Sequence, residues 1–164
     1  MSLIEPILQE FAMEMANTRK MIERIGDEQL DWSPHAKSMN MGRLVAHIAE
    51  LSTWVAAILD MDVYDFDPAG YRPLEIAGIA DALEHFDVGV KAFTEAAKDQ
   101  TDEHLMGRWQ MVIGGQAVID MPRIGVIRGM LLNHLIHHRG QLSVYMRMND
   151  IPLPALYGPS ADEA

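Results

Sequence analysis

The chain has 164 residues, 49% of them hydrophobic and 23% charged, which is enough to bury a core as one domain over residues 1–164. It contains no cysteine, which excludes disulfides, thiolate metal sites and a cysteine nucleophile. The net charge of −11 disfavours phosphate backbones and anionic lipid, so we expect neither nucleic acid nor a membrane as a partner.

The first predicted helix spans about residues 2–25, where apolar side chains recur every three or four positions. Ser2 and Glu5 have the spacing of a capping box at its start. A second helix with the same periodicity is predicted over about residues 41–59. Asn40 is expected to be the N-cap of this second helix.

Residues 60–72 are acidic and contain proline and glycine, so we expect a loop. A third helix is predicted over about residues 73–98, with Pro73 in its first turn. Between residues 107 and 121 the apolar pattern changes from helical spacing to alternation around Gly114–Gly115, which is typical of a tight turn. This segment is expected to be either a small hairpin or a loop.

A fourth helix is predicted over about residues 123–148, after Pro122. Four long amphipathic helices indicate an all-α four-helix bundle, and a two-stranded hairpin cannot form a separate core. The most apolar stretches are interrupted by polar residues, and the N-terminus lacks a basic region. We therefore expect no transmembrane segment, no signal peptide and a cytoplasmic protein.

Two histidines on the fourth predicted helix are the strongest candidates for chemistry. His134 and His138 are four positions apart, so their imidazoles leave the same face, and this face also carries the apolar stripe that points into the bundle. Neutral imidazole is a ligand for Zn, Ni, Cu and Fe, and His47 on the second helix is the candidate third ligand. Three histidines would leave one coordination position open. The spacing is equally compatible with histidines that hydrogen-bond to amides, hydroxyls or backbone groups.

Other polar residues nearby are candidates for supporting roles. Glu50 follows His47 by three positions and is a candidate catalytic base or imidazole partner, although a solvated carboxylate is the simpler interpretation. Tyr145, two turns beyond His138, is a second catalytic candidate, although a core tyrosine is the commoner interpretation. His137 leaves the helix about 100° from His138 and is expected at the surface. The remaining histidines are expected in loops or on polar faces: His35, His85 and His104.

Several named motifs are excluded. Leu135 occupies the position where an H-E-x-x-H zinc motif needs glutamate. No Glu-x-x-His pair occurs, which removes the ferritin-like di-iron site, and there is no P-loop or dinucleotide fingerprint. Arg139 and Gln141 flank the histidine pair and are expected to make hydrogen bonds for helix packing or at an interface.

The run NHLIHHRGQLSVYMRMNDIPLPALYGPSADE resembles the C-terminal signature of the DinB-like family, and SMNMGRLVAHIAE resembles its second-helix motif. The DWSPH loop and the W-Q-M-x-I-G-G stretch are also similar, so the resemblance covers about residues 31–163. It implies a four-helix bundle, often connected up-down-down-up, and commonly a homodimer. It also implies a divalent metal held by His47, His134 and His138. We expect this metal to be Ni or Zn.

The resemblance leaves the activity open, since related proteins include transferases for bacterial low-molecular-weight thiols, a thiol-dependent isomerase and metal hydrolases. Our first hypothesis is a metal-dependent transferase that acts on a small-molecule thiol, because the chain has no thiol of its own. The second is a metal-dependent hydrolase with Glu50 as its base. The third is a non-catalytic metal-binding stress protein. The sequence identifies neither the metal nor the substrate.

Overall fold

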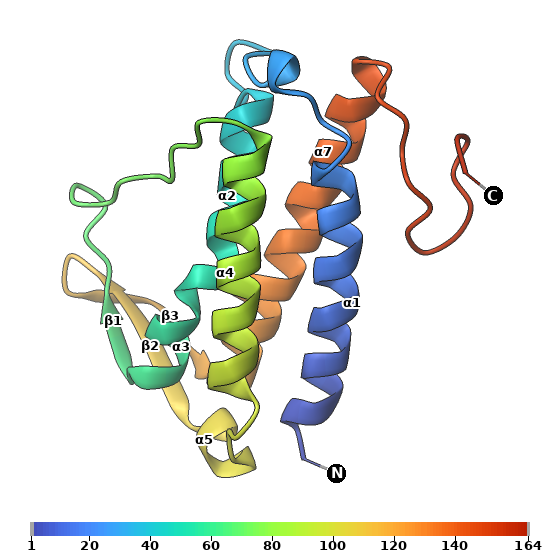
Figure 1. The fold of residues 1–164 in the computed structure, drawn as a ribbon. Helices are drawn as coiled ribbons and strands as arrows, with labels where there is room; N and C mark the ends of the chain where they lie inside the picture. Colours follow the sequence, from blue (N-terminus) through green and yellow to red (C-terminus); the bar gives the residue numbers. More distant parts are fainter. Residues whose placement is uncertain (1, 164) are drawn as a thin grey trace.

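Four long helices form a bundle in the computed structural model, which describes residues 2–163 but not the side chain of Val55. The helices are α1 (Ile4–Ile22), α2 (Met41–Leu51), α4 (Ile79–Ala97) and α7 (His134–Met148). Helix α1 packs against α4 and α7, and α2 packs against the same two helices. Figure 1 shows α1 and α7 running in one direction and α2 and α4 in the other, so the order is up-down-down-up. The predicted four-helix bundle is confirmed.

Shorter elements complete the chain between and beside the long helices. The helical ones are η1 (Asp27–Gln29), η2 (Ser52–Trp54), α3 (Val55–Asp60), α5 (Asp102–Met106), α6 (Arg123–Val126) and the π-helical η3 (Ile127–Asn133). The strands are β1 (Val63–Asp65), β2 (Arg108–Ile113) and β3 (Gln116–Pro122), in the order β1-β2-β3. They lie beside one end of the bundle, next to α3 and α5 (Figure 1).

Of the two alternatives for residues 107–121, the structure shows the hairpin, and it belongs to a three-stranded sheet. Strands β2 and β3 are antiparallel, and both glycines of the turn have positive φ, +57° at Gly114 and +79° at Gly115. Such values favour glycine because it has no Cβ. Strand β1 pairs parallel to β2 inside the segment that was expected to be a loop. A strand of three residues carries too little alternation to be distinguished from a loop by sequence.

Aromatic side chains join the bundle and the sheet. The rings of Phe11 on α1 and Phe93 on α4 pack with their centroids 4.2 Å apart, and both are buried. Trp109 on β2 is also buried, and its indole N–H donates to the Ala57 carbonyl of α3 at 2.9 Å. The buried Arg123 donates to the carbonyl oxygens of Ile58 and Met61, at 3.2 and 3.0 Å. The start of α6 is thereby fixed to α3.

Two helix starts differ from the prediction because distant residues satisfy their backbone groups. Helix α1 begins at Ile4 without the capping box of Ser2 and Glu5, and the Leu3 N–H donates instead to Asp102 at 2.7 Å. The third helix begins six residues after Pro73. Its first N–H, at the start of α4, donates to Asp27 at 2.7 Å, an N-cap contributed by another part of the chain. Neither contact follows from local spacing.

The second and fourth predicted helices are interrupted. Residues 52–54 form the 3₁₀ segment η2, which lies tightly against α4: a Cβ on Gly89 would be only 2.1 Å from the Ser52 hydroxyl. Asn40 caps α2 as predicted, since its side chain accepts from the Arg43 N–H at 2.8 Å. Within the described residues, one helical run, Met41–Asp60, is long and apolar enough to span a membrane, but most of it is buried in the bundle, as a core helix would be.

A buried ion pair joins α1 to α7. The side chains of Glu14 and Arg139 are 4% and 3% exposed, and their charged groups lie 2.5 Å apart. Arg139 also donates to the Glu14 carbonyl at 3.0 Å and to the Thr18 hydroxyl at 3.2 Å. The hydroxyl of Tyr157, from the C-terminal segment, donates to the Glu14 carboxylate at 2.6 Å. The helix-packing role expected for Arg139 is confirmed.

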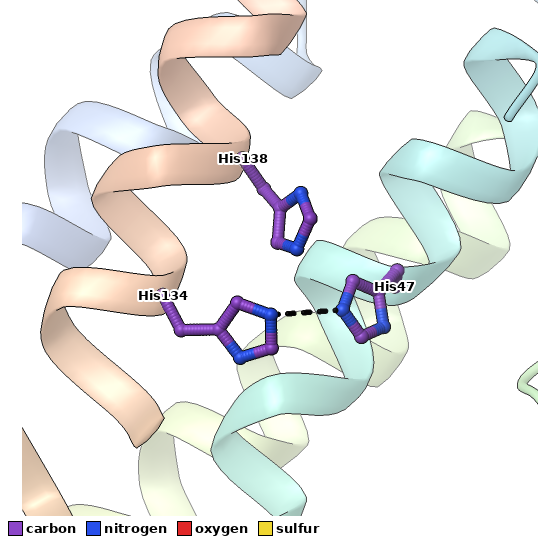
Figure 2. Close-up of side chains that lie close together, drawn as sticks. All are labelled: His47, His134 and His138. Atoms are coloured by element: carbon purple, nitrogen blue, oxygen red, sulfur yellow. Dashed lines mark hydrogen bonds between the residues drawn. The ribbon is translucent and has the colours of Figure 1, made fainter. Parts of the chain in front are cut away.

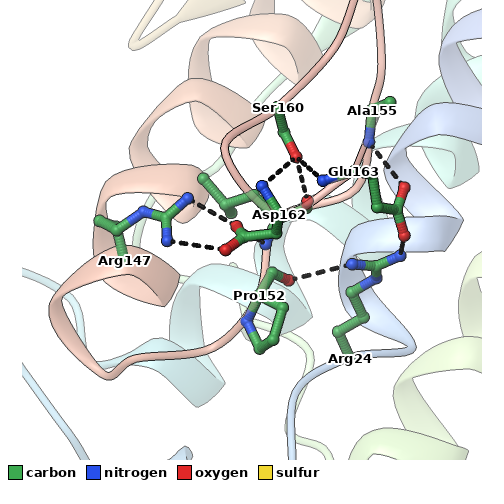
Figure 3. A network of polar contacts seen from close by, with 8 residues as sticks. Arg24, Arg147, Pro152, Ala155, Ser160, Asp162 and Glu163 are labelled. Atoms are coloured by element: carbon green, nitrogen blue, oxygen red, sulfur yellow. Dashed lines mark hydrogen bonds and ion pairs between the residues drawn. The ribbon is translucent and has the colours of Figure 1, made fainter.

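The C-terminal segment after α7 is not helical, and a polar network fixes it to the bundle (Figure 3). Arg147 pairs with Asp162 at 2.7 Å, and Arg24 at the end of α1 pairs with Glu163. The Asp162 carboxylate also accepts from the Leu153 N–H at 2.8 Å. The segment is therefore bonded to α7 and to the residues that directly follow α1.

Candidate metal centre

The structure brings three of the predicted residues together. His47 projects from α2, and His134 and His138 project from successive turns of α7 toward it (Figure 2). One ring nitrogen from each histidine can be chosen so that all three lie within 4.8 Å of one another. The Nε2 atoms of His47 and His134 are 3.4 Å apart. Two nitrogens bound to one tetrahedral zinc ion lie about 3.3 Å apart, so these distances suit a shared ion.

The opposite nitrogens of two of these rings are held by side chains. The Nδ1 atom of His47 lies 2.7 Å from the Glu50 carboxylate, and that of His138 lies 2.7 Å from the Gln141 side-chain oxygen. Each oxygen accepts a hydrogen bond from the Nδ1–H group of its ring, which leaves the lone pair of the ring on Nε2. Metal-binding histidines typically have such a partner on the other nitrogen.

The third ring is held by the backbone of the π-helical segment. The Nδ1 atom of His134 lies 3.3 Å from the Met130 carbonyl within η3. Its Nε2 atom faces that of His47 at hydrogen-bond distance, and if each ring carries its proton on Nδ1, both Nε2 atoms present lone pairs. Two lone pairs at this distance repel each other unless a proton or a cation lies between them. This arrangement indicates that the three residues fit a metal ion.

Two of the histidines, His134 and His138, favour the neutral form that binds metal. Burial lowers the pKa of His138 to about 4, against the opposing effect of its hydrogen bond to Gln141. Burial also lowers the pKa of His134, and the neighbouring His47 lowers it further. A ligand must be deprotonated to bind, so at neutral pH no proton has to leave these two rings.

Glu50 is not the solvated carboxylate of the simpler interpretation, which is wrong. It is 7% exposed because residues 66–78 fold over α2, and its carboxylate accepts from the Tyr71 hydroxyl at 2.7 Å and the Leu74 N–H at 2.9 Å. Burial by itself would raise the pKa of Glu50, but the hydrogen bonds from His47, Leu74 and Tyr71 outweigh it and lower the pKa to about 2.

The structure places Tyr145 in a packing contact. Its hydroxyl donates to the Met39 carbonyl at 3.2 Å, and its ring meets Trp32 edge-on with centroids 5.3 Å apart. It thus links α7 to the segment before α2. His137 is exposed, as expected, and His104 is bonded to the Leu59 carbonyl at 2.8 Å.

Gln141 is the supporting residue that sequence reasoning assigned to a different task. It was expected to make packing or interface hydrogen bonds, whereas it contacts His138. A signal was present in the sequence, because His47–Glu50 and His138–Gln141 share one spacing of three on a helix. Tyr71 and Leu74 carried no such signal, since they reach Glu50 from another segment.

The metal-free protein should lose stability as the pH falls from about 6.5 to 4. The unfolded chain takes up a proton at His138 in this range, whereas the folded protein does not until about pH 4. The loss is at most about 3 kcal/mol, at 1.36 kcal/mol per pKa unit. Urea denaturation between pH 7 and 4 measures it, and His138→Gln should flatten the curve in this window.

Glu50 should affect the stability of the protein at a lower pH than His138 does. Its folded pKa of about 2 is below the unfolded value of 4.5, so its contribution is complete above pH 4.5 and is lost as the pH falls toward 2. Glu50→Gln should therefore change the pH dependence below 4.5 and leave the slope above pH 5 intact. An unchanged slope in His138→Gln would contradict the assignment.

Comparison with known proteins gives consistent matches over nearly the whole chain. The sequence model of the DinB family matches residues 1–164. The uncharacterized protein YrdA of Bacillus subtilis (strain 168) is 27% identical over 162 residues, which cover 98% of this chain and 91% of YrdA.

Two solved structures have a similar fold. A DinB-like protein from Bacillus cereus ATCC 10987 is 24% identical, with a TM-score of 0.71 over 92% of this chain and 95% of that one. The DinB-like protein YjoA from Bacillus subtilis is 20% identical, with a TM-score of 0.69 over 92% of this chain and 96% of that one.

Proposed function

Because this chain belongs to the DinB family and three of its histidines could hold a metal ion, we propose that it is a metal-dependent transferase acting on a low-molecular-weight thiol. The carrying observation is the pair of Nε2 atoms, from His47 and His134, that face each other at 3.4 Å with their other nitrogens held by acceptors. With His138, these residues would supply three neutral ligands. A fourth position would remain for a small molecule.

A divalent ion at this site, Ni or Zn, would supply Lewis acidity that lowers the pKa of a bound thiol. The ligands themselves carry no charge, and the anionic Glu50 is separated from the site by the His47 ring. The three histidines therefore leave the charge of the cation largely uncompensated, which favours an anionic ligand such as a thiolate. The chain has no cysteine, so the thiol has to come from a small molecule.

The state of Glu50 favours transfer over hydrolysis. Hydrolysis benefits from a general base whose pKa is near the working pH. Glu50 has a pKa of about 2, and its oxygens already accept from His47, Tyr71 and Leu74. This carboxylate is suited to orienting His47 and poorly suited to accepting a proton from water. A thiol acidified by a metal needs no such base.

The proposal is tested with metal-loaded protein, a panel of small thiols and the chromogenic electrophile 1-chloro-2,4-dinitrobenzene. We expect the thiol sulfur to displace chloride, giving a thioether and releasing the thiol proton to solvent, faster than with free metal, and we expect loss of this rate in His134→Ala. Glu50→Gln should retain most of the rate at saturating metal, because the residue holds a ligand and does not transfer the proton.

Three outcomes would contradict the proposal. A rate equal to that of free metal, or unchanged in His134→Ala, would remove the transferase. Cleavage of activated esters without any thiol, lost in Glu50→Gln at every metal concentration, would support the hydrolase. Stoichiometric metal without turnover on either panel would support a non-catalytic metal-binding protein.

A further inference from the structure

A pocket lies on the side of Glu50 that faces away from His47 and includes Glu50 in its lining. Its volume is about 380 Å³, within the usual range for small-molecule sites. One oxygen of Glu50 contacts both the His47 ring and the Tyr71 hydroxyl, each at 2.7 Å. Tyr71 is part of the pocket lining. The pocket is thus separated from a candidate metal ligand by a single carboxylate.

Three aromatic side chains from three segments line this pocket. They are Trp54 from η2, Tyr64 from β1 and Tyr71 from the segment before α4. The ring centroids of Trp54 and Tyr64 are 5.9 Å apart at a steep angle, and those of Trp54 and Tyr71 are 6.4 Å apart. All three side chains are half-buried, so part of each ring remains accessible. Such surfaces bind flat, apolar groups.

The pocket also contains an unusual arginine. Eight of the nine arginines in this chain lie within 4 Å of a carboxylate in the described structure. The exception is Arg72, which lines the pocket and is exposed. Its Nη1 atom donates to the carbonyl oxygens of Ala69 and Tyr71, at 2.9 and 3.0 Å. In a chain of net charge −11, an arginine without an acidic partner is available for an anion from outside.

Glu50 does not oppose an anion as strongly as its charge suggests. Its carboxylate accepts from Tyr71, Leu74 and His47, and Arg43 lies 3.3 Å away. The carboxylate charge is therefore already compensated within the protein.

We propose that this pocket binds a planar aromatic carboxylate. The aromatic ring would lie against Trp54 and Tyr64, and the carboxylate would pair with Arg72, whose planar guanidinium matches it geometrically. The binding site itself does not depend on the metal.

Calorimetric titration with three probes of one shape tests the proposal: 1-naphthoate, the neutral 1-naphthalenemethanol and the cationic 1-naphthylmethylammonium. We expect 1-naphthoate to bind most tightly. Arg72→Gln should weaken it at least about tenfold, as the loss of a charge-assisted hydrogen-bond pair predicts, and leave the neutral probe almost unchanged. Arg72→Lys should be intermediate, because lysine keeps the charge but loses the planar fork.

Arg108→Gln is the matched control. It removes the same charge from an exposed arginine on the hairpin, where Arg108 pairs with Asp120. If Arg72→Gln and Arg108→Gln weaken 1-naphthoate binding equally, the effect comes from net charge alone, and the proposal is overturned. Tighter binding of the cationic probe, or no saturable binding of 1-naphthoate, would overturn it as well.

The same titration on His138→Ala separates this proposal from the proposed function. We expect 1-naphthoate to bind that variant as it binds the parent protein, whatever the metal does.

Discussion

Replacing His138 by alanine should abolish stoichiometric metal binding and lower the affinity by more than about 100-fold, the upper end of the loss expected for a supporting residue. His138 is the most buried of the three histidines, and its ring lies 4.6 Å from those of both His47 and His134, centroid to centroid. Without it, two ligands remain, and two rarely hold a divalent ion. Elemental analysis of untagged protein and competition with a chelating dye would measure the loss.

Two neighbours on the same helix provide graded controls. Gln141→Leu removes the acceptor 2.7 Å from His138 Nδ1 but keeps all three ligands, so we expect an affinity loss of about 10- to 100-fold. His137→Ala removes an exposed imidazole and should change nothing. Full occupancy in His138→Ala, or equal losses in all three variants, would contradict a site built from His47, His134 and His138.

The largest effect on stability is expected at the buried ion pair. Glu14→Leu should lower the free energy of unfolding by about 3–5 kcal/mol, because it leaves Arg139 charged, 3% exposed and without its partner. Tyr157 also loses its acceptor. Urea denaturation of the metal-free protein, with the metal-loaded protein measured separately, would give the difference.

A double variant that removes both charges distinguishes the loss of a charge partner from a packing defect. The double variant Glu14→Leu with Arg139→Met should recover a large part of the loss, because it leaves no buried charge alone. Asp120→Ala breaks the exposed pair with Arg108 and should have little effect on stability, because solvent already screens that pair. If the double variant is as unstable as Glu14→Leu, the pair is not the origin of the effect.

The parts of the fold that depend on local spacing could be predicted from sequence. The periodic apolar residues indicated all four long helices, and Gly114–Gly115 indicated the hairpin turn. The spacing of His134 and His138 placed both on one inward face, and His47 on the edge of its stripe completes the cluster. In each case a helical or strand period determines which side chains lie together.

The parts that depend on distant contacts could not. Helix α4 begins at Ile79 because Asp27 caps it, and Glu50 is buried because Tyr71 and Leu74 reach it from a segment about twenty residues away. The period of the sequence carries no information on such pairings. The π-helical turn of η3 was likewise invisible, since its residues continue an ordinary amphipathic pattern.

That π-helical turn allows one continuous helical run to make two separate sets of contacts. Before it, Arg123 donates hydrogen bonds to the carbonyl oxygens of Ile58 and Met61, at the end of α3 and just after it. After it, His134 and His138 face His47. A π turn holds one more residue than an α turn, and one residue corresponds to about 100° of rotation. Deletion of the exposed Gly129 should therefore break one of the two sets of contacts. Either the imidazoles of His134 and His138 rotate away from α2, or Arg123 loses its hydrogen bonds to Ile58 and Met61. The additional residue in η3 thus sets the rotation of the two histidines relative to Arg123.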